Sequence, residues 1–437
     1  MGRPLFNGFL TAASGQRSAR ERGLFCEGEF VSWDALLARG RKRALQVRPQ
    51  QGYLVDPTRG FEAFVSFFAV ATVADTFLLW AKPAPELGTL RELAPGLHQI
   101  EDVIQDPPDR PLWGILTSGS TGAPKVPVGY ADTLELVALH YEAAVFGPTF
   151  EGVDCVETLA TCLPLQFSAA FFMAILPAVF LQRDLLVFPP HDWRALWTVA
   201  QREHVICQSV PSVTAAGSLS APEPIDMSRA ALLLGAGYIT HERVRTIRDR
   251  FRDVRIANIY GTAETGAIAL DREPGHSTHI GRPIPGKPVW LQETNAEGIG
   301  VIATTGVDCR SFYWQPGGAL QHVGGVVAST DYGHFDDEGH LYLDGRVDAG
   351  EKLHGITIYP RIIERHILQL DGVIDARVLI THEPNGREQL TARVVGHVSQ
   401  ARVRDHCAVL EEIQRPTRIE CISETAAQSA YSAHGKL

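Results

Sequence analysis

The sequence predicts an α/β fold: a large N-terminal α/β domain with mixed sheets and a β-rich subdomain, then a small α+β domain. Three observations lead to this fold class. Between residues 150 and 290, short β-like runs alternate with helical patterns, as in α/β sheets. After residue 290 the sequence changes to short strands and turns. Near the C-terminal end, helices and strands are predicted over 359–370, 373–380, 390–396 and 403–413.

We place the domain boundary after residue 345, so the predicted domains are 1–345 and 346–437. A chain of 437 residues is long enough for two or three hydrophobic cores. In the larger domain we expect a serine-capped helix over 32–45. The other elements expected there are a strand at 53–57, a buried helix over 61–80, a strand entering the loop at 116–125, a helix over 241–251 and a hairpin over 331–348. In such a sheet the ligand is expected beyond the carboxyl ends of the strands.

The composition is that of a globular protein, with 45% apolar and 21% charged residues. The net charge of −10 disfavours general nucleic-acid binding, which normally requires a basic excess. Membrane insertion is not expected, because the apolar stretch at 61–80 contains two acidic residues and that at 169–181 is too short. The seven cysteines lack zinc or redox spacing, and the N-terminus lacks the apolar core of a signal peptide. We therefore expect reduced thiols and a cytoplasmic location.

A loop rich in glycine and hydroxyl residues, LTSGSTGAPK (116–125), follows a predicted strand. Its glycines let backbone N–H groups turn inward, and such N–H groups form an anion-binding concavity. The loop lacks the glycine spacing of the GxxxxGK[ST] phosphate loop, and the other interpretation is a flexible polar linker. The residues expected to grip phosphate are Thr117, Ser118, Gly119, Ser120, Thr121, Gly122 and Lys125.

The segment TSGSTGAPK (117–125) matches every fixed position of [ST]SG[ST]TGxPK, the phosphate-loop signature of the adenylate-forming superfamily. The chain therefore resembles acyl-CoA synthetases, the adenylation domains of nonribosomal peptide synthetases and firefly luciferase. Four further motifs follow in the family's order, and the resemblance extends from about Pro111 to Lys436. The short length is similar to that of stand-alone acyl ligases that prime aryl-polyene or fatty-acid-type assembly lines.

Two of these motifs concern the nucleotide. IYGTAETG (259–266) is similar to the family's YGxTE, which implies that Tyr260, Gly261 and Thr262 bind nucleotide and that Glu264 binds Mg²⁺. A carboxylate suits Mg²⁺, a hard cation that prefers oxygen ligands. Ala263 replaces the usual threonine, whose hydroxyl would touch the α-phosphate, and Thr262 is a possible substitute. LLLGAGYIT (232–240) resembles the segment on which adenine lies, here Gly235, Ala236 and Gly237; the other interpretation is a plain strand and turn.

The fourth motif, STDYGHFDDEGHLYLDGRVD (329–348), resembles the family's TGD…GYLxxxGRxDD. The resemblance implies that Asp331 binds the ribose hydroxyls and that Arg346 contacts the ribose or the phosphates. It also implies that Asp348 is the hinge between the domains. Ala349 departs from the pattern. The resemblance continues in EKLHGITIYPRIIE (351–364). It implies that Lys352 and Gly355 lie on the face that receives the pantetheine thiol.

The fifth motif, SAHGKL (432–437), matches the terminal GK of the family and makes Lys436 the catalytic lysine of a mobile small domain. A lysine ammonium can bridge the substrate carboxylate and ATP phosphate as the two anions meet. The resemblance thus implies a two-step reaction, with catalytic roles for Lys436, Glu264 and Arg346. Taken alone, a lysine next to the chain end is a surface residue, and only its order among the motifs supports this role.

The expected acyl pocket contains Phe167, Ser168, Ser209 and Ala267, of which Phe167 has core packing as its other interpretation. Ser168 stands where amino-acid-activating relatives carry an aspartate for the substrate ammonium. Because an unpaired ammonium in a pocket is costly, an aryl or aliphatic acid is expected instead. The cofactors are ATP and Mg²⁺, and the thiol acceptor is coenzyme A or the phosphopantetheine of an acyl carrier protein. The competing function is a non-catalytic nucleotide- or acyl-adenylate-binding protein on the same fold.

Overall fold

The computed structural model describes residues 21–101, 110–116, 126–150, 156–275, 278–315, 317–346, 351–354, 356–382 and 388–423. For Arg346, Lys352, Thr357 and His382 it describes the backbone alone. No helix within these ranges is both long enough and apolar enough to cross a membrane.

The largest sheet has the parallel core that the alternating strand and helix pattern predicts, extended by antiparallel strands. Its parallel strands, in spatial order, are β1 (Gly23–Cys26), β10 (Asp184–Val187), β9 (Thr158–Thr161), β11 (Val205–Ser209), β13 (Ala230–Leu234) and β15 (Arg255–Thr262). At one edge β2 (Glu29–Ser32) pairs with β1. Beyond β15 the order continues through β16 (Gly266–Asp271), β17 (His279–Pro283), β23 (Leu341–Arg346), β22 (Val327–Phe335), β19 (Gly300–Thr304) and β18 (Val289–Gln292).

Burial on both faces explains why the parallel strands are nearly continuous apolar runs. In β13, Ala231 and Leu233 belong to the main core, whereas Leu232 and Leu234 belong to a second core on the opposite face. The second core also contains Trp193 and residues of α10. The helices around this sheet are α8 (Arg194–Ala200), α9 (Pro211–Leu219) and α10 (His241–Arg250). The predicted helix over 241–251 is confirmed, and Thr240 caps it by accepting from the N–H of Arg243.

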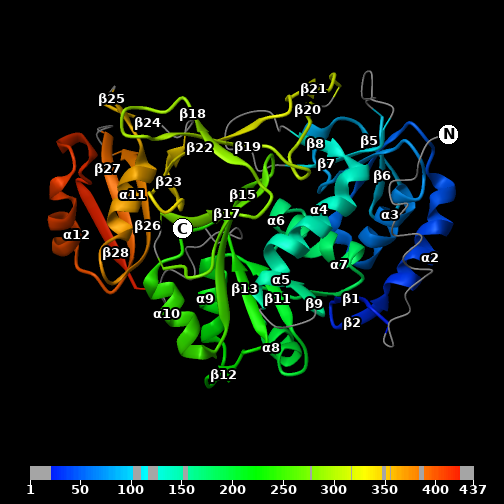
Figure 1. Cartoon of the computed structure of the whole chain (residues 1–437), viewed down its shortest axis with the longest axis horizontal. Helices are drawn as coiled ribbons and strands as arrows, with labels where there is room; N and C mark the ends of the chain where they lie inside the picture. Colours follow the sequence, from blue (N-terminus) through cyan, green and yellow to red (C-terminus); the bar gives the residue numbers. More distant parts are fainter. Residues whose placement is uncertain are drawn as a thin grey trace.

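A second sheet lies at the other end of the large domain, beside the N-terminal helices (Figure 1). Its order is β21 (Gln321–His322), β20 (Phe312–Trp314), β8 (Val126–Tyr130), β7 (Leu112–Ile115), β4 (Phe77–Trp80), β3 (Gly52–Val55), β6 (Leu97–Ile100) and β5 (Leu90–Ala94). The helices of this part are α2 (Trp33–Arg43), α3 (Phe61–Ala71), α4 (Leu134–Tyr141), α5 (Gly147–Thr149), α6 (Ser168–Ala170) and α7 (Leu176–Phe180). Strand β7 leads directly to the predicted phosphate loop, which lies outside the described residues.

The prediction of one buried helix over 61–80 is wrong. Helix α3 ends at Ala71, and residues 77–80 form the parallel strand β4. Asp75, at a left-handed φ of 53°, lies in the connection between the two elements. Both elements are buried, so the apolar run is continuous although the backbone conformation changes within it. By contrast, the serine-capped helix near 32–45 and the hairpin over 331–348 are confirmed by α2 and by β22 with β23.

A small α+β unit lies at the opposite end of the molecule, beside α10 and β23 (Figure 1). Its sheet is β26 (Val373–His382), β27 (Glu388–Gly396) and β28 (Arg418–Ile422), and its helices are α11 (Pro360–Leu368) and α12 (Gln400–His406). It has its own core, which includes Ile363, Ile367 and Val378. Short pairs β24 (Glu351–Leu353) with β25 (Ile356–Ile358), and β12 (Ile225–Asp226) with β14 (Phe251–Arg252), complete the strands. The predicted helix over 403–413 is shorter than expected, because α12 ends at His406 and short 3-10 turns follow.

Candidate active site

Part of the predicted site falls outside the described residues. This part comprises Thr117, Ser118, Gly119, Ser120, Thr121, Gly122, Lys125, Asp348, Gly355 and Lys436. Arg346 lies opposite Asp331 in the β22–β23 ladder. The predicted adenine turn and the Tyr260–Thr262 segment lie at the carboxyl ends of the neighbouring parallel strands β13 and β15, as expected for an α/β sheet, whereas Asp331 lies within the antiparallel strand β22.

The predicted adenine turn follows β13 immediately. A Cβ added at Gly235 would lie 2.8 Å from the carbonyl oxygen of Ile259 on β15, so the two backbones pass too close for a side chain. Ala236 adopts a left-handed φ of 60°, which is uncommon for a residue with a side chain. Gly237 comes next, and a Cβ added there would lie 3.4 Å from Pro211. The turn is therefore small and tightly formed, which suits a flat ring lying on the backbone.

Tyr260 and Asp331 meet although they are 71 positions apart. The Tyr260 hydroxyl donates to Oδ2 of Asp331 at 2.7 Å. The N–H of Asp331 in turn donates to the hydroxyl of Ser329 at 3.0 Å. This pair joins β15 to β22 and fixes the orientation of the carboxylate that the sequence assigns to the ribose.

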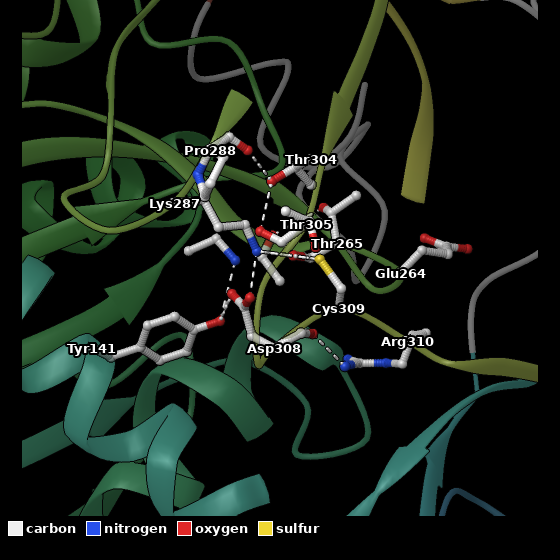
Figure 2. A network of polar contacts seen from close by, with 12 residues as sticks. Tyr141, Glu264, Thr265, Lys287, Pro288, Thr304, Thr305, Asp308, Cys309 and Arg310 are labelled. Atoms are coloured by element: carbon white, nitrogen blue, oxygen red, sulfur yellow. Dashed lines mark hydrogen bonds and ion pairs between the residues drawn. The ribbon is translucent and has the colours of Figure 1, made fainter. Parts of the chain in front are cut away.

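Glu264 lies in the turn between β15 and β16. The Thr262 hydroxyl accepts from the N–H groups of Glu264 at 3.3 Å and Thr265 at 3.2 Å. The Thr262 hydroxyl therefore helps to shape the turn. Its contact with the α-phosphate stays a prediction. Gly261 faces Gly266 across the turn, where an added Cβ would lie 2.2 Å from the Gly266 carbonyl oxygen. The Glu264 carboxylate is half-buried and points away from the polar cluster below it (Figure 2).

The Glu264 site fits Mg²⁺ only in partnership with a phosphate ligand. Among the described residues, no group of three or more histidine, cysteine or acidic side chains is arranged to hold a metal. Mg²⁺ typically keeps several waters and is bound through one or two carboxylates plus substrate phosphates. A single half-buried carboxylate just after the predicted nucleotide residues Tyr260 to Thr262 is consistent with that mode.

The predicted acyl-pocket residues fall into two places. Phe167 is half-buried and precedes Ser168, the first residue of α6, and it packs against Leu163 and Val210. Ser209 ends β11 next to Val210, and its buried hydroxyl lies 3.2 Å from Sγ of Cys162. These residues lie near one another.

Ala267 is different, because it packs in the main core and its N–H donates to the Tyr141 hydroxyl at 3.1 Å. Its place in an acyl pocket therefore stays a prediction.

Contacts between the two domains begin one residue after the adenine turn. The Tyr238 hydroxyl donates to Oε2 of Glu364 at 3.3 Å and accepts from Arg361 at 3.4 Å. Burial, the largest effect, and the neighbouring Glu364 raise the pKa of Tyr238 to about 12, although Arg361 opposes this. Arg243 of α10 forms a buried ion pair with Asp375 of β26 at 2.5 Å. The small unit is thus attached to the large one mainly through polar groups.

The family model for AMP-binding enzymes matches residues 54–299, which is more than half of the chain. The chain belongs to this family. The matched segment contains the predicted adenine turn, Tyr260 and Glu264, whereas Asp331 and Arg346 lie beyond it. It also covers the phosphate loop, which agrees with the resemblance to adenylate-forming enzymes.

Two curated relatives of this AMP-binding enzyme are similar over most of its length. An indoleacetate–CoA ligase of Aromatoleum aromaticum is 26% identical over 80% of this chain and 72% of its own. An L-proline–[L-prolyl-carrier protein] ligase of Pseudomonas fluorescens is 28% identical over 76% of this chain and 68% of its own. Among solved structures, ATP-bound MatB from Rhodopseudomonas palustris aligns with a TM-score of 0.68, at 17% identity, over 97% of this chain and 95% of its own. This likeness shows the fold.

A buried polar cluster that no sequence motif indicated lies next to the Glu264 turn. It consists of Tyr141, Lys287 and Asp308, with Cys309 and Arg310 at its edge (Figure 2). Neither Lys287 nor Asp308 belongs to one of the motifs described above, so no local pattern in the sequence distinguishes them from solvated charged residues.

Proposed function

We propose that this AMP-binding enzyme is an AMP-forming ligase, which adenylates an aryl or aliphatic carboxylic acid and transfers the acyl group to a phosphopantetheine thiol. The observation that supports this most strongly is the hydrogen bond between Asp331 of β22 and Tyr260, which lies near the carboxyl end of β15 just before the turn that carries Glu264. The family match and the two ligase relatives agree with it.

In the first half-reaction a carboxylate oxygen of the acid attacks the α-phosphorus of ATP, and pyrophosphate leaves. The turn at Gly235, Ala236 and Gly237 would receive adenine, while Asp331 would accept hydrogen bonds from the ribose hydroxyls. Lys436, the phosphate loop and Arg346 would offset the negative charge that gathers as the two anions meet. Mg²⁺, bound by Glu264 and phosphate oxygens, would supply further neutralisation of that charge.

In the second half-reaction a thiol attacks the carbonyl of the acyl-adenylate, and AMP leaves. We propose that the small domain turns about Asp348, which withdraws Lys436 and brings the face with Lys352 and Gly355 to the site. The polar contacts of Arg243 and Tyr238 with the small domain support this, since contacts of this kind can exchange for water at modest cost.

The proposed class of carboxylic-acid substrate is inferred from Ser168 and the residues around it. Phe167 packs with apolar residues, and no carboxylate stands at position 168 to pair with an α-ammonium group. Because a charged group left unpaired in a pocket is costly, an α-amino acid is disfavoured.

Pyrophosphate exchange into ATP tests the first half-reaction, with a panel of aryl, aliphatic and α-amino acids. We expect exchange with at least one aryl or aliphatic acid and none with the amino acids. If the protein binds ATP but supports no exchange with any acid, the non-catalytic nucleotide-binding function is the correct one. Supplying preformed acyl-adenylate with either coenzyme A or a carrier protein bearing phosphopantetheine then identifies the acceptor.

A further inference from the structure

The polar cluster beneath Glu264 holds the backbone on both sides of Gly266 (Figure 2). Lys287 donates from Nζ to the Thr265 carbonyl oxygen at 2.5 Å and also pairs with Oδ1 of Asp308. Oδ2 of Asp308 accepts from the Tyr141 hydroxyl at 2.8 Å. That hydroxyl accepts in turn from the N–H of Ala267 at 3.1 Å. The cluster therefore fixes the residue before Gly266 and the residue after it.

Glycine at position 266 lets Asp308 approach the turn directly. Gly266 has a left-handed φ of 65°, and a Cβ added there would lie 2.2 Å from Oδ2 of Asp308. The carboxylate therefore occupies the space where a side chain would be. The chain after Asp308 adds another contact, since the N–H of Arg310 donates to the Glu264 carbonyl oxygen at 2.9 Å. The backbones of Glu264, Thr265 and Ala267 are thus each hydrogen-bonded to the cluster or to Arg310, and Gly266 packs directly against Asp308.

The cluster also connects the Glu264 turn to the strand that enters the phosphate loop. The guanidinium of Arg310 lies 4.0 Å from the ring centre of Trp113, in β7, and 4.5 Å from that of Phe172. Its Nη1 donates to the Asp308 carbonyl oxygen at 2.7 Å. One short segment, Asp308 to Arg310, therefore contacts both the Glu264 turn and the strand that leads to the predicted phosphate loop.

Burying the Lys287–Asp308 pair costs desolvation free energy, so the pair is not explained by stability alone. The side chains of Lys287 and Asp308 are 1% and 0% exposed. A buried ion pair is weak evidence for stability, because well-packed apolar side chains often stabilise a core as well or better. The pair does, however, fix backbone geometry that apolar side chains would leave without hydrogen bonds.

We propose that Asp308 is a positioning residue: together with Lys287 and Tyr141 it sets the β15–β16 turn so that the Glu264 carboxylate is held ready for Mg²⁺–ATP. Asp308 acts through the turn and does not touch the nucleotide. This inference rests on the proposed function, because it assumes that Glu264 serves a metal–nucleotide complex.

The test is Asp308→Asn, which preserves shape but removes the charge and leaves Lys287 buried without its anion. We measure ATP binding by calorimetry at a series of Mg²⁺ concentrations, which requires no turnover. Partners that orient a ligating carboxylate typically change metal affinity about 10- to 100-fold. We therefore expect a rise of about that size in the Mg²⁺ concentration that half-saturates tight ATP binding, with little change in ATP binding without metal.

The matched control is Asp184→Asn in the parallel sheet, where the fully buried carboxylate pairs with Arg22 at 2.8 Å. This variant should lower the melting temperature without changing the Mg²⁺ dependence. Tyr141→Phe removes a single hydroxyl from the cluster and should shift the Mg²⁺ dependence in the same direction as Asp308→Asn, by less. It also keeps the test available if Asp308→Asn fails to fold.

A second comparison separates positioning from stability. The double variant Lys287→Met with Asp308→Asn removes both charges, so the melting temperature should recover relative to Asp308→Asn alone. The Mg²⁺ dependence should stay shifted, because the Thr265 carbonyl has lost its donor. An unshifted Mg²⁺ dependence in Asp308→Asn and Tyr141→Phe, or an equal shift in Asp184→Asn, would overturn the inference. Absence of pyrophosphate exchange in the wild type would instead reject the proposed function, while the Mg²⁺-dependent binding still reports on Asp308.

Discussion

The hydroxyl of Tyr260 is hydrogen-bonded to the carboxylate of Asp331 at 2.7 Å, which joins the last parallel strand of the large sheet to a strand of its antiparallel extension. Both residues are members of motifs that the sequence assigns to the nucleotide. Their contact places the aromatic ring expected near adenine beside the acid expected at the ribose. One hydrogen bond thus fixes the orientation of the carboxylate that the sequence assigns to the ribose hydroxyls.

Asp331→Asn should weaken ATP binding selectively. The amide cannot accept from both ribose hydroxyls as a carboxylate does, and a hydrogen bond to a charged group contributes roughly 1.5–3 kcal/mol. We expect the KM for ATP in pyrophosphate exchange to rise about tenfold or more, with a smaller change in kcat. Asp337→Asn, at an exposed position of the hairpin turn, is the control and should leave the KM unchanged. Equal KM values for ATP in wild type and Asp331→Asn would remove Asp331 from the nucleotide site.

Cys162 gives a pH dependence of stability beside the predicted acyl pocket. Burial, the largest effect, raises its pKa from 9.0 to about 11, although the hydrogen bond with Ser209 opposes this. The folded state therefore keeps the proton longer than the unfolded chain. The resulting stability is complete below pH 9 and is lost as the pH rises through 11.

Urea unfolding between pH 8 and 11 measures this contribution. A shift of this size corresponds to a loss on the order of 2 kcal/mol in the free energy of unfolding over that range. In Cys162→Ala the decline with pH should be shallower than in the wild type. Cys421→Ala, at a less buried position, should leave the slope close to that of the wild type. Identical slopes for wild type and Cys162→Ala would mean that the thiol ionises as it does in the unfolded chain.

Sequence patterns predicted the parts of the fold and site that depend on local residues. The strand and turn at 231–237 and the helix α10 each follow from residues close together in the chain. The division of 61–80 into α3 and β4 did not follow, because a continuous apolar run lacks the periodicity that distinguishes a buried helix from a buried strand.

The cluster of Tyr141, Lys287 and Asp308 escaped prediction for a different reason. Tyr141 and Asp308 are 167 positions apart, and their meeting depends on the packing of α4 against the end of the β15–β16 turn. Isolated charged residues between strands are usually solvated, so neither Lys287 nor Asp308 stands out without its partner. Long-range pairs of this kind are set by tertiary packing, and no spacing rule within one segment reveals them.

Lys436→Ala should separate the two half-reactions. Removing a group that offsets charge in the transition state typically costs 100- to 1,000-fold in rate. We expect a loss of about this size in acyl-adenylate formation. Thiolation of preformed acyl-adenylate should remain near the wild-type rate, because the proposed rotation of the small domain withdraws Lys436 in that step. Lys82→Ala, at an exposed position of the large domain, is the control. A parallel loss of both half-reactions would contradict the rotation of the small domain.

Asp375→Asn should shift the balance between the two half-reactions by loosening the small domain. Arg243 is 2% exposed and also donates to the Tyr238 carbonyl at 2.7 Å, so the variant leaves a buried cation without its anion in the docked arrangement. Undocking hydrates that cation, and the population therefore moves away from the docked pose. We expect the single-turnover rates of adenylation and thiolation to change in opposite directions. Arg393→Ala, which removes a partner of Glu420 within the small unit's own sheet, is the control and should leave the ratio of the two rates unchanged. If Asp375→Asn instead lowers both rates equally, along with the melting temperature, the ion pair serves folding and not domain exchange.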